Sequence, residues 1–170
     1  MMNVSNVLKD KVVLVVDDEV DVLDTVEDLL DECIVNRAGD FSTAQQYLMS
    51  YTYDIVILDI MGVNGFELLR TSVQRGFPTV MLTAYAVTPE ALEKSMKLGA
   101  VAFLPKEKMT DLEEFLSDVV LGEGKPIWEK LFRKLSNYFN QRFGPDWKQK
   151  KQFFADFEAA MKRDEGIDND

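Results

Sequence analysis

Short runs of consecutive hydrophobic residues alternate along the chain with longer stretches in which hydrophobic positions recur every three or four residues. A short β-branched run that ends at polar residues is typical of a strand buried on both faces of a parallel sheet. The longer stretches carry charged residues between the hydrophobic positions, as amphipathic helices do. The expected strands lie near 11–16, 34–38, 54–59, 78–82 and 100–104. The expected helices lie near 21–31, 42–50, 66–74, 88–99 and 110–121.

The order of these elements predicts the fold class. Five strand–helix units in succession specify an α/β fold with a doubly wound, five-stranded parallel sheet and helices on both faces. Local signals mark several helix ends: Ser42 and Gln45 fit a capping box, Pro89 fits a first helical position and Gly99 fits a helix end. In sheets of this kind, ligands bind at the carboxyl ends of the strands.

Beyond residue 121 the chain follows a different pattern. Residues 122–125 contain two glycines and are typical of a linker. After them, aromatic and aliphatic residues recur at helical spacing on both sides of Gly144-Pro145, which predicts a helical hairpin with arms of about 18 residues. We therefore expect a first domain at 1–121 and a hairpin extension at 126–170, whose acidic end we expect to be disordered.

Charge and composition exclude several classes of protein. The net charge of −11 argues against a protein that coats nucleic acid or an anionic membrane through its overall field. The chain has no histidine, which excludes serine–histidine or cysteine–histidine catalysis and histidine-ligated metals. The single Cys33 allows no internal disulfide, and we expect it to be a buried residue at a helix end. With no apolar run near 18 residues and no signal-peptide pattern at the start, we expect a cytoplasmic protein that does not contact membranes.

Polar residues lie where the predicted strands end. Asp17 and Asp18 follow the first strand, Asp59 ends the third, Thr83 ends the fourth and Lys106 follows the fifth. Three clustered carboxylates repel one another unless a cation is present, and a hard divalent ion such as Mg²⁺ prefers oxygen ligands of this kind. The lysine and the hydroxyl suit a second anion, such as a phosphoryl group that is transferred to a carboxylate.

The same residues, in their sequence contexts, resemble the receiver domain of two-component response regulators. The resemblance covers roughly residues 9–121 and depends on four motifs in order: Val16-Asp17-Asp18-Glu19, Leu58-Asp59-Ile60-Met61, Leu82-Thr83-Ala84 and Phe103-Leu104-Pro105-Lys106. It implies a flavodoxin-like receiver fold. It also implies a signalling domain rather than an enzyme, one that assists its own phosphorylation and dephosphorylation.

The resemblance also implies a role for each residue. Asp59 would be the phosphoacceptor. Asp17, Asp18 and Asp59, together with the backbone carbonyl of Met61, would hold Mg²⁺. Thr83 and Lys106 would contact the phosphoryl oxygens, and Phe103 would stand where the family has an aromatic switch residue.

Three positions depart from the family pattern. Gly62 follows Met61 where the family usually has proline, so we expect a looser loop over the site. Pro105 precedes Lys106, whereas the family tends to have proline after the lysine with a cis peptide bond. The bond after Lys106 is therefore expected to be trans, or else a strained exception. Phe103 lacks a hydroxyl, so a switch at this position would act through packing.

These inferences predict a response-regulator receiver. A sensor histidine kinase or a phosphotransfer protein would phosphorylate Asp59, and the change would alter a protein-interaction surface and the helical extension. One alternative is a pseudo-receiver scaffold that is not phosphorylated, which the altered loop and the Pro105-Lys106 order favour. Another is an aspartyl-phosphate enzyme of the haloacid-dehalogenase type. That class has Asp-x-Asp after the first strand, where this chain has adjacent Asp17-Asp18.

The role of the extension is left open by its sequence. It either packs on itself and on the first domain, or acts as an output or homodimerisation element, because aromatic stripes on one short hairpin often need a partner. At about 45 residues it is too short for a usual winged-helix domain and has no clear helix-turn-helix pattern, so we do not expect DNA binding.

Overall fold

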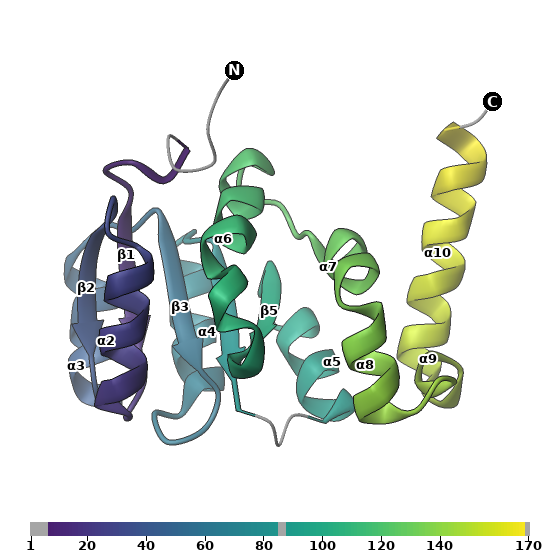
Figure 1. Ribbon diagram of the computed structural model, residues 1–170, viewed down its shortest axis with the longest axis horizontal. Coiled ribbons are helices and arrows are strands. Elements are labelled where there is room, and N and C mark those ends of the chain that lie inside the picture. Colours follow the sequence, from purple (N-terminus) through teal and green to yellow (C-terminus); the bar gives the residue numbers. More distant parts are fainter. Residues whose placement is uncertain (1–6, 85–87, 169–170) are drawn as a thin grey trace.

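The structure is a computed structural model that describes residues 7–84 and 88–168, with side chains to Ala160. The residues on which the signal-peptide expectation rests, 1–6, lie outside this part. One parallel sheet forms the centre of the molecule, with the strand order β2-β1-β3-β4-β5 (Figure 1). Its strands are β1 (Val12–Val16), β2 (Ile34–Ala38), β3 (Ile55–Asp59), β4 (Thr79–Thr83) and β5 (Ala102–Pro105).

Helices cover both faces of the sheet. They are α2 (Val20–Leu29), α3 (Phe41–Ser50), α4 (Gly65–Gln74), α5 (Pro89–Lys97) and α6 (Leu112–Leu121), with a 3₁₀ helix η1 (Lys106–Asp111) before α6. Helix α2 packs beside α6, and α3 packs beside α4. This is the doubly wound, flavodoxin-like arrangement, so the predicted fold class is confirmed.

The central strands are fully buried because helices lie against both of their faces. Every residue of β3 and β4 is buried, and so are four of the five residues of β1. This burial explains why these strands have nearly continuous hydrophobic sequences rather than alternating ones. The parallel register aligns the carboxyl ends of the strands along one edge of the sheet.

Two of the three predicted helix ends are confirmed. The Thr88 hydroxyl accepts a hydrogen bond from the Ala91 N–H at the start of α5, with Pro89 in first position, and Gly99 follows the end of that helix. The predicted Ser42 cap is wrong. The Asp40 carboxylate caps α3 by accepting the Thr43 N–H at 2.8 Å, because Asp40 has the extended backbone of an N-cap and its charge makes a stronger acceptor than a hydroxyl.

The extension forms four helices that together make a bent hairpin. They are α7 (Trp128–Lys134), α8 (Ser136–Phe143), α9 (Trp147–Lys150) and α10 (Gln152–Asp168). The predicted break at Gly144 is present between α8 and α9. Each predicted arm is itself interrupted, the first at Leu135 and the second at Lys151, where the backbone leaves helical geometry. Helix α10 runs through Asp168, which belongs to the acidic end that we expected to be disordered.

An aromatic cluster holds these four helices together, and we call the region from α7 to α10 the tail. Phe132 of α7 lies at its centre, with ring centroids 5.6–6.3 Å from four aromatic residues of α8, α9 and α10: Phe139, Trp147, Phe154 and Phe157. Most contacts are edge-to-face, the arrangement that aromatic rings prefer. The tail therefore has a hydrophobic core of its own.

The tail also packs onto β5, an edge strand of the sheet. The Ile127 N–H donates to the Val101 carbonyl and the Trp128 Nε1–H to the Ala100 carbonyl, both at 2.9 Å. Trp128 and Leu131 are buried against the main core. The two carbonyls directly precede β5, and buried backbone groups of this kind require such partners, which Ile127 and the first residue of α7 supply.

Candidate functional site

The predicted site residues lie at the carboxyl ends of the strands, along the lower edge of the sheet in Figure 1. Val16 is paired with Leu58, so Asp17 and Asp59 leave neighbouring strands side by side. Thr83 is paired with Pro105, so Lys106 emerges one residue beyond Thr83 on the next strand. The order of strands thus explains how residues 89 positions apart meet at one place.

Lys106 connects the acidic residues of the site. Its Nζ lies 2.8 Å from Asp17 Oδ2, 3.5 Å from Asp59 Oδ1 and 3.2 Å from Glu19 Oε1. Glu19 is a residue that our sequence analysis quoted only as part of a motif and gave no role. Its position next to Asp17-Asp18 was the available signal, because a carboxylate there can reach the same lysine. One ammonium therefore contacts three carboxylates.

Two of these three acids, Asp17 and Asp59, are withdrawn from water. Asp17 is fully buried and Asp59 is 5% exposed. Burial, followed by the charge of Asp17, raises the pKa of Asp59 to about 7, although Lys106 opposes the shift. Burial also raises the pKa of Asp17, against the hydrogen bonds from Lys106 and the Glu19 N–H. A single lysine does not fully compensate two buried carboxylates, so the site has an affinity for further positive charge.

A divalent cation fits the donors on one side of this site. Asp17, Asp18 and Glu19 each offer a carboxylate oxygen, and the three atoms lie within 4.8 Å of one another. Asp17 Oδ2 is buried, and its ion pair with Lys106 Nζ at 2.8 Å leaves a lone pair of this oxygen for a cation. All these donors are carboxylate oxygens, as Mg²⁺ prefers. Asp59 joins the cluster through Lys106.

The loop after β3 passes very close to the acids. Gly62 has a φ of +81°, and a Cβ there would lie 2.6 Å from Asp18 Oδ2. At Gly65, a Cβ would lie only 2.0 Å from the Asp59 carbonyl oxygen. Gly62 is therefore required by its backbone conformation and its closeness to Asp18, and Gly65 by its contact with the Asp59 backbone. The Met61 side chain points into solvent and is 74% exposed, so this residue would serve a metal only through its backbone.

Thr83 and Phe103 are both buried near this edge. Thr83 is 5% exposed at the end of β4, and Phe103 is completely buried in β5, paired with Met81. Phe103 therefore lies in the hydrophobic core. Within the described part of the chain no peptide bond is cis, so the bond after Lys106 has the trans form that was one of the two expectations.

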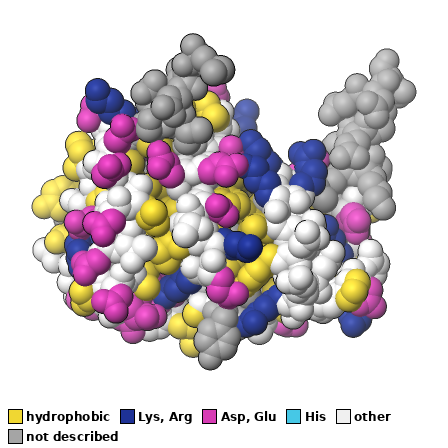
Figure 2. All heavy atoms as spheres, viewed as in Figure 1, with side chains coloured by type: hydrophobic (Ala, Val, Ile, Leu, Met, Phe, Trp, Pro, Cys, Tyr) yellow, Lys and Arg dark blue, Asp and Glu magenta, His cyan; other side chains and the backbone are white. Residues whose placement is uncertain are grey.

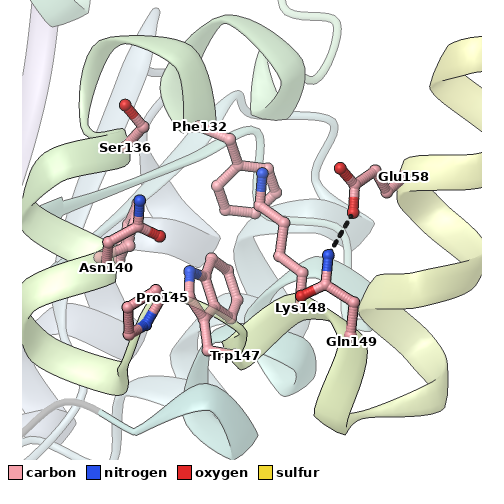
Figure 3. Close-up of a pocket in the computed structure, with 9 residues that line it drawn as sticks. Phe132, Ser136, Asn140, Pro145, Trp147, Lys148, Gln149 and Glu158 are labelled. Carbon is pink, nitrogen blue, oxygen red and sulfur yellow. Dashed lines mark hydrogen bonds between the residues drawn. The ribbon is translucent and has the colours of Figure 1, made fainter.

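Two other features lie outside this site. A hollow of about 180 Å³ opens in the tail between α8, α9 and α10, lined by Phe132, Trp147 and Lys148 among others (Figure 3). Cys33 is half-buried after α2, its thiol donates to the Leu8 carbonyl at 3.4 Å, and burial raises its pKa to about 11. A thiol held protonated in this way is a structural residue rather than a nucleophile.

Comparison with known proteins agrees with this geometry. The model of the response regulator receiver domain family matches residues 13–117. The probable transcriptional regulatory protein SilR of Salmonella typhimurium is 35% identical over 100 residues, which are 55% of this chain and 43% of that protein. The chain thus matches less than half the length of that relative. Among residues 7–84 and 88–168, none of the helices has the length and hydropathy needed to span a bilayer.

Solved structures of similar proteins have a similar fold. Full-length FixJ from B. japonicum is 28% identical, with a TM-score of 0.59 over 71% of this chain and 62% of that one. NtrX from Brucella abortus is 26% identical, with a TM-score of 0.60 over 76% of this chain and 29% of that one. A CheY-like receiver domain protein from Methanospirillum hungatei is 21% identical and shares the fold, with a TM-score of 0.58 over 68% of this chain and 99% of that one. Together with the acidic edge and Lys106, the family match over most of the chain shows that the protein belongs to the response regulators and that residues 13–117 are its receiver domain.

Proposed function

We propose that Asp59 accepts a phosphoryl group from the phosphohistidine of a partner kinase or phosphotransfer protein, in a reaction that requires Mg²⁺. The observation that carries the proposal is the placement of Lys106 Nζ between the buried carboxylates of Asp17 and Asp59, at 2.8 and 3.5 Å. Phosphoryl transfer needs positive charge on both sides of the moving group. Lys106 supplies one side, and the cluster of Asp17, Asp18 and Glu19 can hold the cation that supplies the other.

The chemistry follows from these positions. An Asp59 carboxylate oxygen attacks phosphorus, a new P–O bond forms, and the P–N bond to the donor imidazole breaks, leaving the histidine nitrogen with the electron pair. Lys106 then exchanges its contact with Asp59 for a phosphoryl oxygen, and the Thr83 hydroxyl on the neighbouring strand orients another. Asp17, Asp18, Asp59 and the Met61 carbonyl would hold Mg²⁺, which would neutralise negative charge on the phosphoryl oxygens when bound. Attack by water on the same phosphorus later breaks the P–O bond to Asp59, releases inorganic phosphate and returns Asp59 to its free carboxylate form.

The domain acts as a signalling element and not as an enzyme with a separate substrate. Phosphorylation shifts the balance between two states of the surface formed by α5, β5 and α6, and Phe103 of β5 is a buried aromatic residue beneath it. The tail packs on this surface, with Lys134 bound to Glu114 and Asp118 of α6 at 2.8 and 2.7 Å. Figure 2 shows basic side chains along this boundary, beside the more acidic receiver domain. The tail is thus the segment that reads the change and presents it to a protein partner or a second copy.

The test is intact mass after incubation with acetyl phosphate, with and without Mg²⁺, for the native chain and for Asp59→Ala. We expect one phosphoryl adduct that needs both Mg²⁺ and Asp59. Asp28→Ala, which removes an exposed carboxylate of α2, serves as the matched control and should be labelled normally. If the native chain takes no adduct under conditions that label a known receiver, the protein is a phosphorylation-independent scaffold and the proposal is wrong.

A further inference from the structure

The tail touches the residue that directly follows Lys106. Tyr138 of α8 donates its hydroxyl hydrogen to Glu107 Oε1 at 3.2 Å. Glu107 occupies the place where receivers of this family tend to have proline after the lysine, and it lies in the first turn of η1. A flexible charged side chain therefore stands where a rigid residue is usual, and it is bound by a residue of the tail.

Tyr138 is itself held in place by the packing of the tail. It is half-buried, and its ring lies 5.5 Å from that of Phe139 in an edge-to-face contact. Helix α7 is anchored to β5, and Lys151 at the other end of the tail pairs with Glu90 and Glu93 of α5 at 3.2 and 3.4 Å. The hydroxyl of Tyr138 is thus presented to Glu107 from a body that contacts α5, β5 and α6.

The contact has a consequence for Lys106. Three carboxylates of the described residues lie within ion-pair distance of Lys106 Nζ, those of Asp17, Glu19 and Asp59, and Glu107 is not among them. Glu107 is bound to Tyr138 instead. Because the hydrogen bonds of a 3₁₀ turn are weaker than those of an α-helix, the first residues of η1 are held less firmly by their own backbone. The hydrogen bond from Tyr138 to Glu107 therefore limits their motion.

We propose that Tyr138 is a positioning residue for the phosphoryl site: it binds Glu107, fixes the first turn of η1 and thereby sets the position of Lys106. This inference rests on the proposed function of Asp59. Because coupling between two sites is reciprocal, docking of the tail favours the Lys106 position that phosphorylation needs, and phosphorylation in turn changes how firmly α8 is held. The extension is then a working part of the receiver site as well as its output.

The first experiment measures the rate at which acetyl phosphate labels Asp59 in the native chain and in Tyr138→Phe, which removes only the hydroxyl. We expect the variant to be labelled about threefold to tenfold more slowly, the range expected for loss of one hydrogen bond to a charged group at a partly exposed site. Tyr51→Phe, an exposed tyrosine after α3, is the matched control and should leave the rate unchanged. Glu107→Ala, which removes the acceptor, should slow labelling similarly, and adding Tyr138→Phe to it should have no further effect.

The second experiment measures amide hydrogen exchange in peptides that cover 106–111 and 136–143. In the unphosphorylated chain, Tyr138→Phe should speed exchange in both segments, and Tyr51→Phe in neither. In the native chain, phosphorylation should change exchange in 136–143, and this response should be lost in Tyr138→Phe even though the variant still accepts the phosphoryl group. A tyrosine that only stabilised the tail would leave that response in place.

The outcomes separate the two proposals. If the native chain is labelled but Tyr138→Phe is labelled equally fast and 136–143 keeps its response, the positioning role is wrong and the proposed function stands. If the native chain is never labelled, the proposed function is wrong. In that case unchanged exchange at 106–111 in Tyr138→Phe would also refute the coupling between the tail and Lys106, and faster exchange there would support it.

Discussion

The buried carboxylate of Asp59 should lower the stability of the folded protein at neutral and alkaline pH. Burial and the neighbouring Asp17 raise its pKa from 3.8 to about 7, so the folded state holds this proton over a pH range in which the unfolded state has lost it. Wherever the folded state binds more protons, the free energy of unfolding falls as the pH rises. The free energy of unfolding therefore falls between about pH 4 and about pH 7. Above pH 7 the buried charge destabilises the folded state by its full amount.

The size of this effect follows from the same values. The difference between 3.8 and about 7 corresponds to roughly 4 kcal/mol at pH 8. Asp59→Asn keeps the shape of the side chain and removes the charge, but it also removes one of the three carboxylates that face Lys106. We therefore expect the variant to be about 2 kcal/mol more stable than the native chain at pH 8, and close to it at pH 5.

Urea unfolding at pH 5, 6, 7 and 8, in the presence of a chelator, measures this difference directly. Asp28→Asn, which neutralises an exposed carboxylate on α2, should show no such trend. Adding Mg²⁺ at pH 8 should stabilise the native chain more than Asp59→Asn, because the cation offsets the charge that the substitution removes. The measured quantity is the difference in free energy of unfolding between Asp59→Asn and the native chain. If this difference is no larger at pH 8 than at pH 5, the electrostatic reasoning is wrong.

Three further substitutions test the packing around the site and the tail. Gly62→Ala places a Cβ against the Asp18 carboxylate and should weaken Mg²⁺ binding about tenfold by calorimetry, whereas Gly76→Ala, with nearly the same φ but open space around it, should not. Trp128→Phe leaves the Ala100 carbonyl without its donor and should lower the free energy of unfolding by about 1–3 kcal/mol in urea titrations. Phe132→Ala should cost about 3–5 kcal/mol in a single thermal transition, and two separate transitions would show that the tail folds independently.

The sequence predicted the main elements of the site because parallel strands bring their carboxyl ends together. Asp17, Asp59, Thr83 and Lys106 each stand at or just after the end of a hydrophobic run, and the sheet order places them on adjacent strands. No knowledge of side-chain conformation was needed for that step. The pairing of Glu19 with Lys106 depends on the rotamers of two long side chains, which the hydrophobic pattern does not specify.

Other features could not be predicted from the sequence, because they depend on the backbone path or on contacts between segments that are distant in the sequence. Gly62 could be recognised as a loop residue, but its closeness to Asp18 comes from how the loop after β3 folds over β1. The cap of α3 was misassigned because Asp40 and Ser42 are both good capping residues and only the backbone path decides between them. The hydrogen bond of Tyr138 to Glu107 joins residues 31 positions apart and depends on the docking of the whole tail.

The structure shows what buries the aromatic residues of the tail. The sequence left two alternatives open for them: packing on one another and on the first domain, or binding to a partner, because one short hairpin often cannot bury two aromatic stripes. Phe132, Phe139, Trp147 and Phe154 are instead buried among α7–α10, and Trp128 and Leu131 are buried against the receiver domain. Their hydrophobic character is therefore explained within one chain. If Asp59 is phosphorylated as proposed, the polar contacts of α8 and Lys151 with η1 and α5 are the contacts between tail and receiver that lie closest to the change and are placed to respond.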